Sequence, residues 1–160
     1  MMLLMRQIQK DVILLLDIKK RIAYLKKKYC TSNPFKLADI LGILVIKEDL
    51  GNIEGYYNKQ LRQKQIHINC NLSEKDMLLT CAHELGHALL HPDSNTKFLR
   101  NNTLLSVDKL ELEANYFAIE LLVSDEAIQE YKSYTIAQLS RLLGYSERLL
   151  LLKLENRQKY

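Results

Sequence analysis

Apolar positions change their spacing along the chain, and the changes divide it into helical, extended and again helical parts. Over residues 6–28 apolar side chains recur about every 3.6 residues with Lys and Arg between them, which predicts an amphipathic helix. Asn33 and Pro34 predict the start of a short helix that ends at Gly42, since Asn is a favoured N-cap and Pro suits the first helical position.

Extended segments follow in the middle of the chain. Residues 43–47 are mostly β-branched and apolar, which favours a strand. Residues 53–58 and 65–69 flank a polar stretch, a pattern typical of a hairpin or meander. We therefore expect a small antiparallel or mixed sheet of about three strands.

The second half of the chain is again helical in pattern. Ser73, with Asp76 three residues later, predicts a helix that continues to about Leu90 and that Pro92 prevents from continuing. Residues 93–107 are expected to form a loop. The remaining helices are expected over 109–122 with Asp108 as N-cap, from Ser124, over 135–143 and over 146–157. A small sheet packed on a predominantly helical body is an α+β fold.

Length and composition describe an ordinary globular chain. Its 160 residues make about one domain, and 48% hydrophobic with 26% charged residues excludes a disordered or low-complexity protein. No Pro-, Ser- or Gly-rich linker interrupts the sequence. We predict a single domain over 1–160, with a core to about residue 125 and a C-terminal helical subregion over about 126–160.

Cysteine usage and hydropathy indicate a cytoplasmic protein. Its three Cys have no CxxC spacing, which argues against a disulfide framework. The longest apolar run, residues 40–46, is far shorter than the roughly 20 residues of a membrane-spanning helix. The N-terminus lacks the pattern of a signal peptide. We expect no contact with a membrane.

Positive charge gathers near the N-terminus. The net charge is +4, and residues 1–50 carry 10 Lys and Arg against 5 Asp and Glu. A nucleic-acid face is one interpretation, but no aromatic or Arg-rich residues accompany the lysines, which favours a solvated helix face.

From Thr135 the pattern also resembles a helix-turn-helix. Its second helix begins Glu147, Arg148 and then runs Leu149 to Leu152, which favours a packed helical pair or a substrate-docking surface over direct DNA binding.

The pattern His-Glu-x-x-His occurs within the helix expected to end near residue 90. His83 and His87 are four residues apart and therefore share one helix face, where two imidazoles can bind one Zn²⁺. Glu84 lies about 100° round the helix, where it can reach a water molecule beside the metal without being a ligand. Chance would produce this pattern in roughly one such chain in a hundred. We therefore favour a catalytic zinc site with Glu84 as the catalytic base.

A catalytic zinc site needs a third protein ligand, and no later His follows. Glu111 and Glu113, on a later predicted helix, are both candidates. Glu111 shares its face with small and apolar residues suited to packing, whereas Glu113 lies on a partly charged face. Asn115 lies four residues after Glu111 and could accept the free N–H of a ligand His. This pattern favours Glu111 without excluding Glu113.

The sequence AHELGHALLH over 82–91, together with ELEANYFA over 111–118, resembles the ImmA/IrrE family of zinc metallopeptidases, found on mobile elements and phages and as stand-alone regulators. The likeness covers most of the chain. Val123 and Ser124 stand where the family usually has Met-Pro, away from the metal motif. The resemblance implies a thermolysin-like site in which His83, His87 and Glu111 hold zinc, with Asn115 behind a ligand. It also implies cleavage of a helix-turn-helix repressor, which derepresses mobile-element genes.

Several further residues are weaker candidates. Tyr56 could donate to the oxyanion of the reaction, with Tyr57 and Tyr116 as alternatives. His91 is expected to act as a helix C-terminal cation or in a local hydrogen bond. His67 alternates with isoleucines, so we expect it to face solvent from a strand whose exposed edge could pair with a substrate.

Three functions fit these observations. The chain is predicted to be a zinc endopeptidase acting on a repressor protein. A DNA-binding or zinc-sensing regulator with a structural site is the second, and a non-proteolytic anti-repressor is the third. The intact Glu84 favours the enzyme, because a purely structural site needs no base beside an open zinc position.

Overall fold

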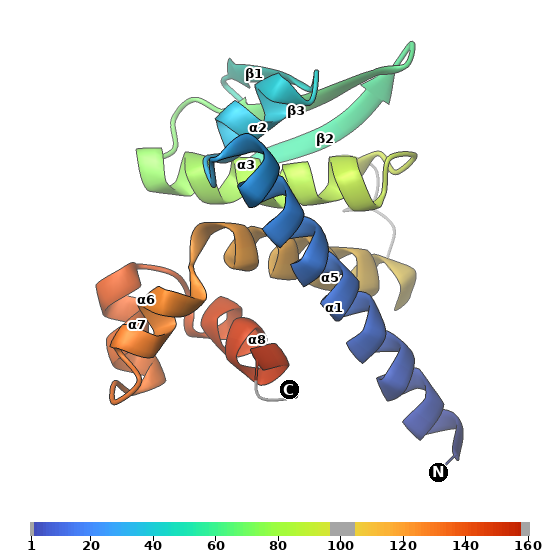
Figure 1. Ribbon diagram of the computed structural model, residues 1–160. Coiled ribbons are helices and arrows are strands. Elements are labelled where there is room, and N and C mark those ends of the chain that lie inside the picture. The colour runs from blue at the N-terminus through green and yellow to red at the C-terminus, as the bar shows by residue number, and fades with distance from the viewer. Residues whose placement is uncertain (1, 97–104, 158–160) are drawn as a thin grey trace.

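Figure 1 shows a computed structural model of the chain, which describes residues 2–96 and 105–157. Its helices are α1 (Met2–Tyr29), α2 (Pro34–Ile40), α3 (Glu74–Leu90), α5 (Leu105–Leu122), α6 (Asp125–Glu130), α7 (Ile136–Leu143) and α8 (Glu147–Arg157). Its strands are β1 (Leu44–Glu48), β2 (Gly55–Gln60) and β3 (Gln63–Asn69). The predicted α+β fold is confirmed. The division of the chain at about residue 125 stays a prediction.

The three strands form one mixed sheet in the order β1-β3-β2. β2 and β3 form the expected antiparallel hairpin, in which Tyr57 pairs with Ile66. β1 pairs with β3 in parallel. The strand that carries His67 is therefore the central one and has no exposed edge, contrary to our expectation, because β1 covers the side that the hairpin leaves open.

Helix α3 lies between the sheet and α5 (Figure 1). Small residues make this close packing feasible. A Cβ atom on Gly86 would lie 3.1 Å from Phe117 Cβ and 3.2 Å from Ala114 Cα on α5. On the sheet side, a Cβ atom on Gly55 would lie 2.5 Å from Thr80 Cγ2 of α3. Backbones therefore approach where side chains are smallest, and the two faces of α3 are covered by different elements.

Polar caps set most helix boundaries where the sequence predicted them. Ser73 Oγ accepts a hydrogen bond from the Asp76 backbone N–H, and Asn33 Oδ1 caps α2. The beginning of α5 differs from the prediction. It starts at Leu105, so 105–107 are helical and Asp108 is not the N-cap. Acidic residues are favoured throughout the first helical turn, so Asp108 did not mark its first residue. Residues 97–104 of the expected loop lie outside the described residues.

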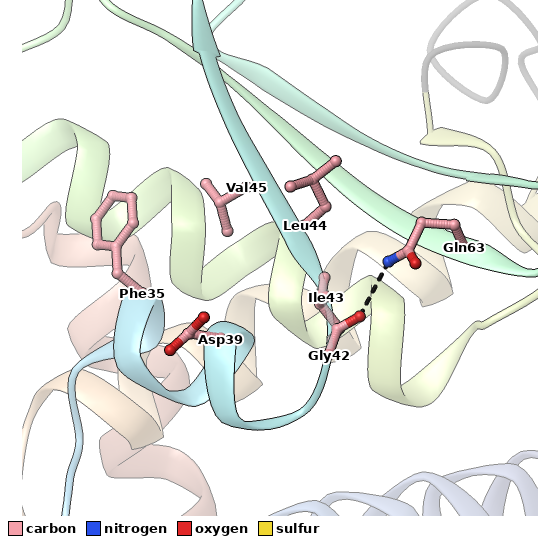
Figure 2. Close-up of a pocket in the computed structure, with 7 residues that line it drawn as sticks. All are labelled: Phe35, Asp39, Gly42, Ile43, Leu44, Val45 and Gln63. Carbon is pink, nitrogen blue, oxygen red and sulfur yellow. Dashed lines mark hydrogen bonds between the residues drawn. The ribbon is translucent and has the colours of Figure 1, made fainter.

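A surface cavity of about 450 Å³ lies between α2 and β1 (Figure 2). Gln63 Nε2 donates a hydrogen bond to the Gly42 backbone oxygen at its rim, at 3.0 Å. Asp39 is the one ionisable side chain among the residues that line it, which are Phe35, Asp39, Gly42, Ile43, Leu44, Val45 and Gln63. A single carboxylate offers no cluster of catalytic groups, and we assign the cavity no chemistry.

Across 2–96 and 105–157, no helix is both long enough and apolar enough to cross a membrane.

The C-terminal helices pack on the body of the protein, with α8 against both α5 and α7. Buried ion pairs hold α8 against the body of the protein. Lys153 of α8 is 1% exposed, and its Nζ lies 2.7 Å from Glu120 Oε2 and 3.0 Å from Asp125 Oδ1. Lys19 of α1 donates to Asp125 Oδ2 at 2.8 Å.

These contacts make the junction sensitive to acid. Burial opposes ionisation of Asp125, but hydrogen bonds from Lys19 and Lys153 outweigh it and lower the pKa of Asp125 to about 2. A carboxyl group with a lowered pKa stabilises the folded state above its unfolded pKa of about 4, and loses that contribution as the pH falls towards 2.

We predict that Lys153→Met lowers the free energy of unfolding by about 3 kcal/mol, because it leaves the buried Glu120 carboxylate without its cation. Chemical denaturation at pH 7 measures this loss. Lys132→Met, at an exposed position of similar chemistry, is the control and should change stability by less than about 0.5 kcal/mol. Equal stability of the two variants would contradict the assigned role of Lys153.

Candidate metal centre and active site

Helix α3 places the two histidines of the His-Glu-x-x-His motif on one face. His83 and His87 lie one turn apart, with ring centroids separated by 4.8 Å. Their Nε2 atoms are 3.1 Å apart, and His87 is fully buried. Two ring nitrogens thus converge on one point beside the helix, as the sequence spacing predicted.

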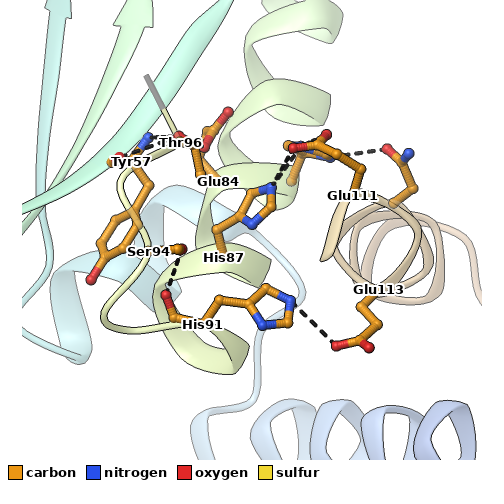
Figure 3. Close-up of polar contacts among 10 residues, drawn as sticks. Tyr57, Glu84, His87, His91, Ser94, Thr96, Glu111 and Glu113 are labelled. Carbon is orange, nitrogen blue, oxygen red and sulfur yellow. Dashed lines mark hydrogen bonds and ion pairs between the residues drawn. The ribbon is translucent and has the colours of Figure 1, made fainter. Parts of the chain in front are cut away.

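Glu111 of α5 completes this group from the facing helix (Figure 3). Its Oε2 lies 3.2 Å from His83 Nε2 and its Oε1 lies 3.3 Å from His87 Nε2. Zinc bonds of about 2.0–2.1 Å in a tetrahedron separate neighbouring ligand atoms by about 3.3 Å. The distances between the three side chains are thus close to those among the ligands of one metal ion, and two nitrogens with one carboxylate are a donor set that suits zinc.

The electrostatics of the group also favour a cation. Burial opposes the ionisation of Glu111, but its contacts with His83 and His87 outweigh this and hold its pKa well below the usual range. Burial likewise disfavours a charged His83, but the contact with Glu111 prevails and raises the pKa of His83. Glu111 is thus kept ionised next to two imidazoles, and its negative charge favours the binding of a cation.

Asn115, one turn beyond Glu111 on α5, orients one of the histidines. His83 Nδ1 lies 2.9 Å from Asn115 Oδ1. The amide oxygen can only accept, so Nδ1 carries a proton, and in the neutral ring Nε2 is the lone-pair atom that faces Glu111 and His87. The structure places Asn115 where the four-residue spacing from Glu111 predicted it.

Glu84 lies beside this group and is fully buried. It lines the same cavity of about 240 Å³ as His83 and Glu111. One of its contacts was not predicted. Thr96, in the segment expected to be a loop, places its hydroxyl 3.1 Å from Glu84 Oε2 (Figure 3). A lone Thr in a polar loop has no pattern from which this contact could have been found.

Glu113, the alternative third ligand, faces a different histidine. Its Oε2 lies 3.3 Å from His91 Nε2, in the turn beyond His87 (Figure 3). Burial, reinforced by the neighbouring His87, lowers the pKa of His91 to about 4. His91 is therefore uncharged at neutral pH, which argues against the first of its two expected roles, a helix cation, and its contact is with a different helix, through Glu113 of α5. Among Glu111 and Glu113, the structure brings Glu111 to His83 and His87.

Tyr56 and His67 lie elsewhere than expected. The missing Cβ of Gly55 points at Thr80 and Glu84, and successive strand residues alternate, so Tyr56 points to the opposite face of the sheet. There its ring stacks on His67 at 4.4 Å, and His67 Nδ1 contacts a carboxylate oxygen of Glu48. His67 is 9% exposed and does not face solvent. The structure thus separates Tyr56 from the three candidate ligands.

The two other tyrosines also have different surroundings from those expected of an oxyanion donor. Tyr57 donates its hydroxyl hydrogen to the backbone oxygen of Pro92 at 2.8 Å. Tyr116 is 2% exposed and belongs to the hydrophobic core.

A larger groove of about 700 Å³ between α5 and α8 adjoins the cavity. Glu111, Asn115 and Leu149 line both spaces, which are therefore neighbours. The rest of the groove is lined by Leu112, Arg148, Leu151, Leu152 and Glu155. Helix α8 therefore forms one wall of the space that leads to the candidate ligands.

Comparison with known proteins identifies the family. Residues 38–155 match the sequence profile of a peptidase family described as the IrrE N-terminal-like domain. Metallopeptidase ImmA of Bacillus subtilis (strain 168) is 37% identical over 119 residues, which make up 73% of this chain and 69% of that protein. The chain belongs to the ImmA/IrrE family of metallopeptidases. A protein of Bacillus phage phi105, named uncharacterized immunity region protein 2, is 45% identical over 139 residues, 85% of this chain and 88% of that protein.

Membership of the ImmA/IrrE family confirms the resemblance drawn from the motifs and identifies the chain as a metallopeptidase. It implies a divalent metal, and the group of His83, His87 and Glu111 is a site that fits one. The matched segment includes all three residues as well as Glu84, Asn115 and most of α8.

We predict that Glu111→Gln weakens zinc binding by more than the 10- to 100-fold typical of an outer partner, because it removes a charged ligand. Glu113→Gln, the matched variant two residues away, should retain the affinity within about threefold. Competition titration against a zinc-binding dye measures both constants. The reverse order of the two effects would make Glu113 the ligand.

Proposed function

We propose that the protein is a zinc-dependent endopeptidase that cleaves a helix-turn-helix repressor and so relieves the repression of mobile-element or phage genes. The observation that carries the peptidase chemistry is that Glu84 lines one cavity together with His83 and Glu111, two members of the candidate ligand group that His87 completes. Three protein ligands leave one position of a tetrahedral ion open, which distinguishes catalytic from structural zinc sites.

Zinc is the proposed metal because two imidazoles and one carboxylate in this geometry suit it. A zinc ion held there would lower the pKa of a water molecule and polarise the carbonyl of the scissile bond. Within this arrangement Glu84 accepts the proton from the attacking water and delivers it to the leaving amine. Asn115 keeps His83 in the tautomer whose Nε2 faces the site.

Support for a polypeptide substrate comes from the groove between α5 and α8. It is about three times as large as the cavity that Glu84 lines, and the two share Glu111, Asn115 and Leu149. Leu112 and Leu151 are each 42% exposed on its walls, which suits the side chains of an extended chain. The names ImmA and immunity region protein, borne by the two relatives, agree with a protein target. A repressor acts in the cytoplasm, where we place the reaction.

Direct DNA binding is not part of this proposal. In a helix-turn-helix the second helix must present side chains to the major groove. Here α8 packs against α5 and α7, with Leu150 and Lys153 buried. This packing supports the first of the two expected alternatives to DNA binding, a packed helical pair, and the groove beside α8 is compatible with the second, a substrate-docking surface.

A non-proteolytic anti-repressor and a zinc-sensing regulator remain the alternatives, and they differ from the peptidase in their need for Glu84. Both require binding alone, so neither needs a base beside the open metal position.

We predict that the zinc-loaded protein makes one discrete cut in the helix-turn-helix protein encoded beside its gene, seen by mass spectrometry of the intact products. Glu84→Gln should slow the cut by about 100- to 10,000-fold, because it removes the base but keeps the shape. Glu130→Gln, at an exposed position, is the matched control and should cleave like the parent protein. Derepression in cells that is unaffected by Glu84→Gln would favour the anti-repressor.

A further inference from the structure

The segment that follows α3 is fastened to strand β2. Tyr57 donates its hydroxyl hydrogen to the Pro92 backbone oxygen at 2.8 Å, and Lys59 Nζ lies 2.9 Å from Asp93 Oδ1. Ser94 donates its hydroxyl hydrogen back to the His91 backbone oxygen at 2.6 Å. These contacts hold residues 91–96 along the edge of the sheet beside α3.

Thr96 lies at the end of this fastened segment and is 1% exposed. Its Oγ1 accepts a hydrogen bond from the Tyr57 backbone N–H at 2.6 Å. The same oxygen lies 3.2 Å from the Tyr57 backbone oxygen and 3.1 Å from Glu84 Oε2 (Figure 3). One buried hydroxyl thus joins the outer edge of β2 to the carboxylate on α3.

The hydrogen-bonding capacity of a hydroxyl decides what this contact does. Thr96 has a single hydrogen to donate and two acceptors within reach, a peptide oxygen and a carboxylate. Glu84 Oε2 is the nearer of these two acceptors, at 3.1 Å against 3.2 Å for the Tyr57 backbone oxygen, so Thr96 can donate its hydrogen to Glu84. The N–H of Tyr57 fixes the oxygen from the other side, so Thr96 holds one carboxylate oxygen of Glu84 in place.

We propose that Thr96 is a positioning residue for the peptidase reaction, which sets the orientation of the Glu84 carboxylate towards the attacking water. This rests on the role of Glu84 in the proposed function, but not on the identity of the substrate. The contrasting role is that of a restraint, in which Thr96 must separate from β2 before a substrate can bind. In that case, removal of the Thr96 hydroxyl would raise the rate of cleavage.

The test compares Thr96→Val, which keeps the shape and removes the hydroxyl, with Thr96→Ser, which keeps the hydroxyl. We expect Thr96→Val to lower kcat by about tenfold or more, as the loss of a hydrogen bond to a charged group implies, with KM within about twofold. Thr96→Ser should restore kcat to within about threefold of the parent. A kcat that is unchanged or raised in Thr96→Val would overturn the proposal.

Two controls separate positioning from a general loss of structure. Thr135→Val makes the same substitution at the N-cap of α7, far along the chain, where the hydroxyl accepts from the Gln138 backbone N–H. Ser94→Ala removes a hydroxyl from the same segment that bonds to His91 instead of Glu84. Both should keep kcat within about threefold. A fall in kcat in Ser94→Ala equal to that in Thr96→Val would assign the effect to the segment as a whole and overturn the proposal.

The contact itself is measured without catalysis by hydrogen exchange of the Tyr57 amide in the metal-free protein. Exchange should be faster in Thr96→Val and close to the parent rate in Thr96→Ser, because the hydroxyl is the acceptor for that N–H. Unchanged exchange in Thr96→Val would show that the contact is not formed.

The kinetics use a library of quenched fluorescent peptides, as well as the neighbouring helix-turn-helix protein. If the repressor is not the substrate, peptides that the enzyme cleaves still report the effect of Thr96→Val, and only the substrate assignment fails. If the Glu84→Gln variant cleaves these peptides at the parent rate, the proposed role of Glu84 fails, and the proposal for Thr96 fails with it.

Discussion

The close packing of α3 against α5 is the constraint on which the site depends. Neither helix carries a complete set of ligands: His83 and His87 come from one, Glu111 from the other. Gly86 faces Ala114 and Phe117 where the helices approach, and any added Cβ there would have to displace a neighbour. Because helices separated by larger side chains would hold Glu111 away from the imidazoles, a contact between small apolar residues determines whether the polar residues meet.

Buried ionisable groups are concentrated around this contact. Glu84 and His87 are fully buried, and Lys153 with Glu120 is nearly so on the far side of α5. Burying such groups is unfavourable unless each has a partner of complementary charge. Lys153 finds its partners within the protein, in Glu120 and Asp125. The group around Glu111 combines a lowered carboxyl pKa with converging nitrogens, the condition under which a cation becomes part of the folded structure.

Sequence patterns predicted those features whose cause is local. His83 and His87 meet because four residues make about one helical turn, and Asn115 follows Glu111 by the same spacing. Caps such as Ser73 also act within a few residues. The side on which Tyr56 points depends on strand register, where one residue inverts every side chain. The central position of β3 depends on parallel pairing with a strand about 20 residues earlier. The contacts of Thr96 and Lys153 are set by tertiary structure alone, and no sequence pattern near either residue indicates its partners.

Helix α8 supplies a wall of the groove but none of the candidate ligands. Its attachment depends on Lys153, which points away from that groove into the junction with α5 and α6. Residues that face the groove, such as Arg148 and the exposed Leu151, can therefore change without loss of either the anchor or the candidate metal ligands. Substitutions on one short C-terminal helix can thus alter what the groove accepts while the candidate ligands stay unchanged.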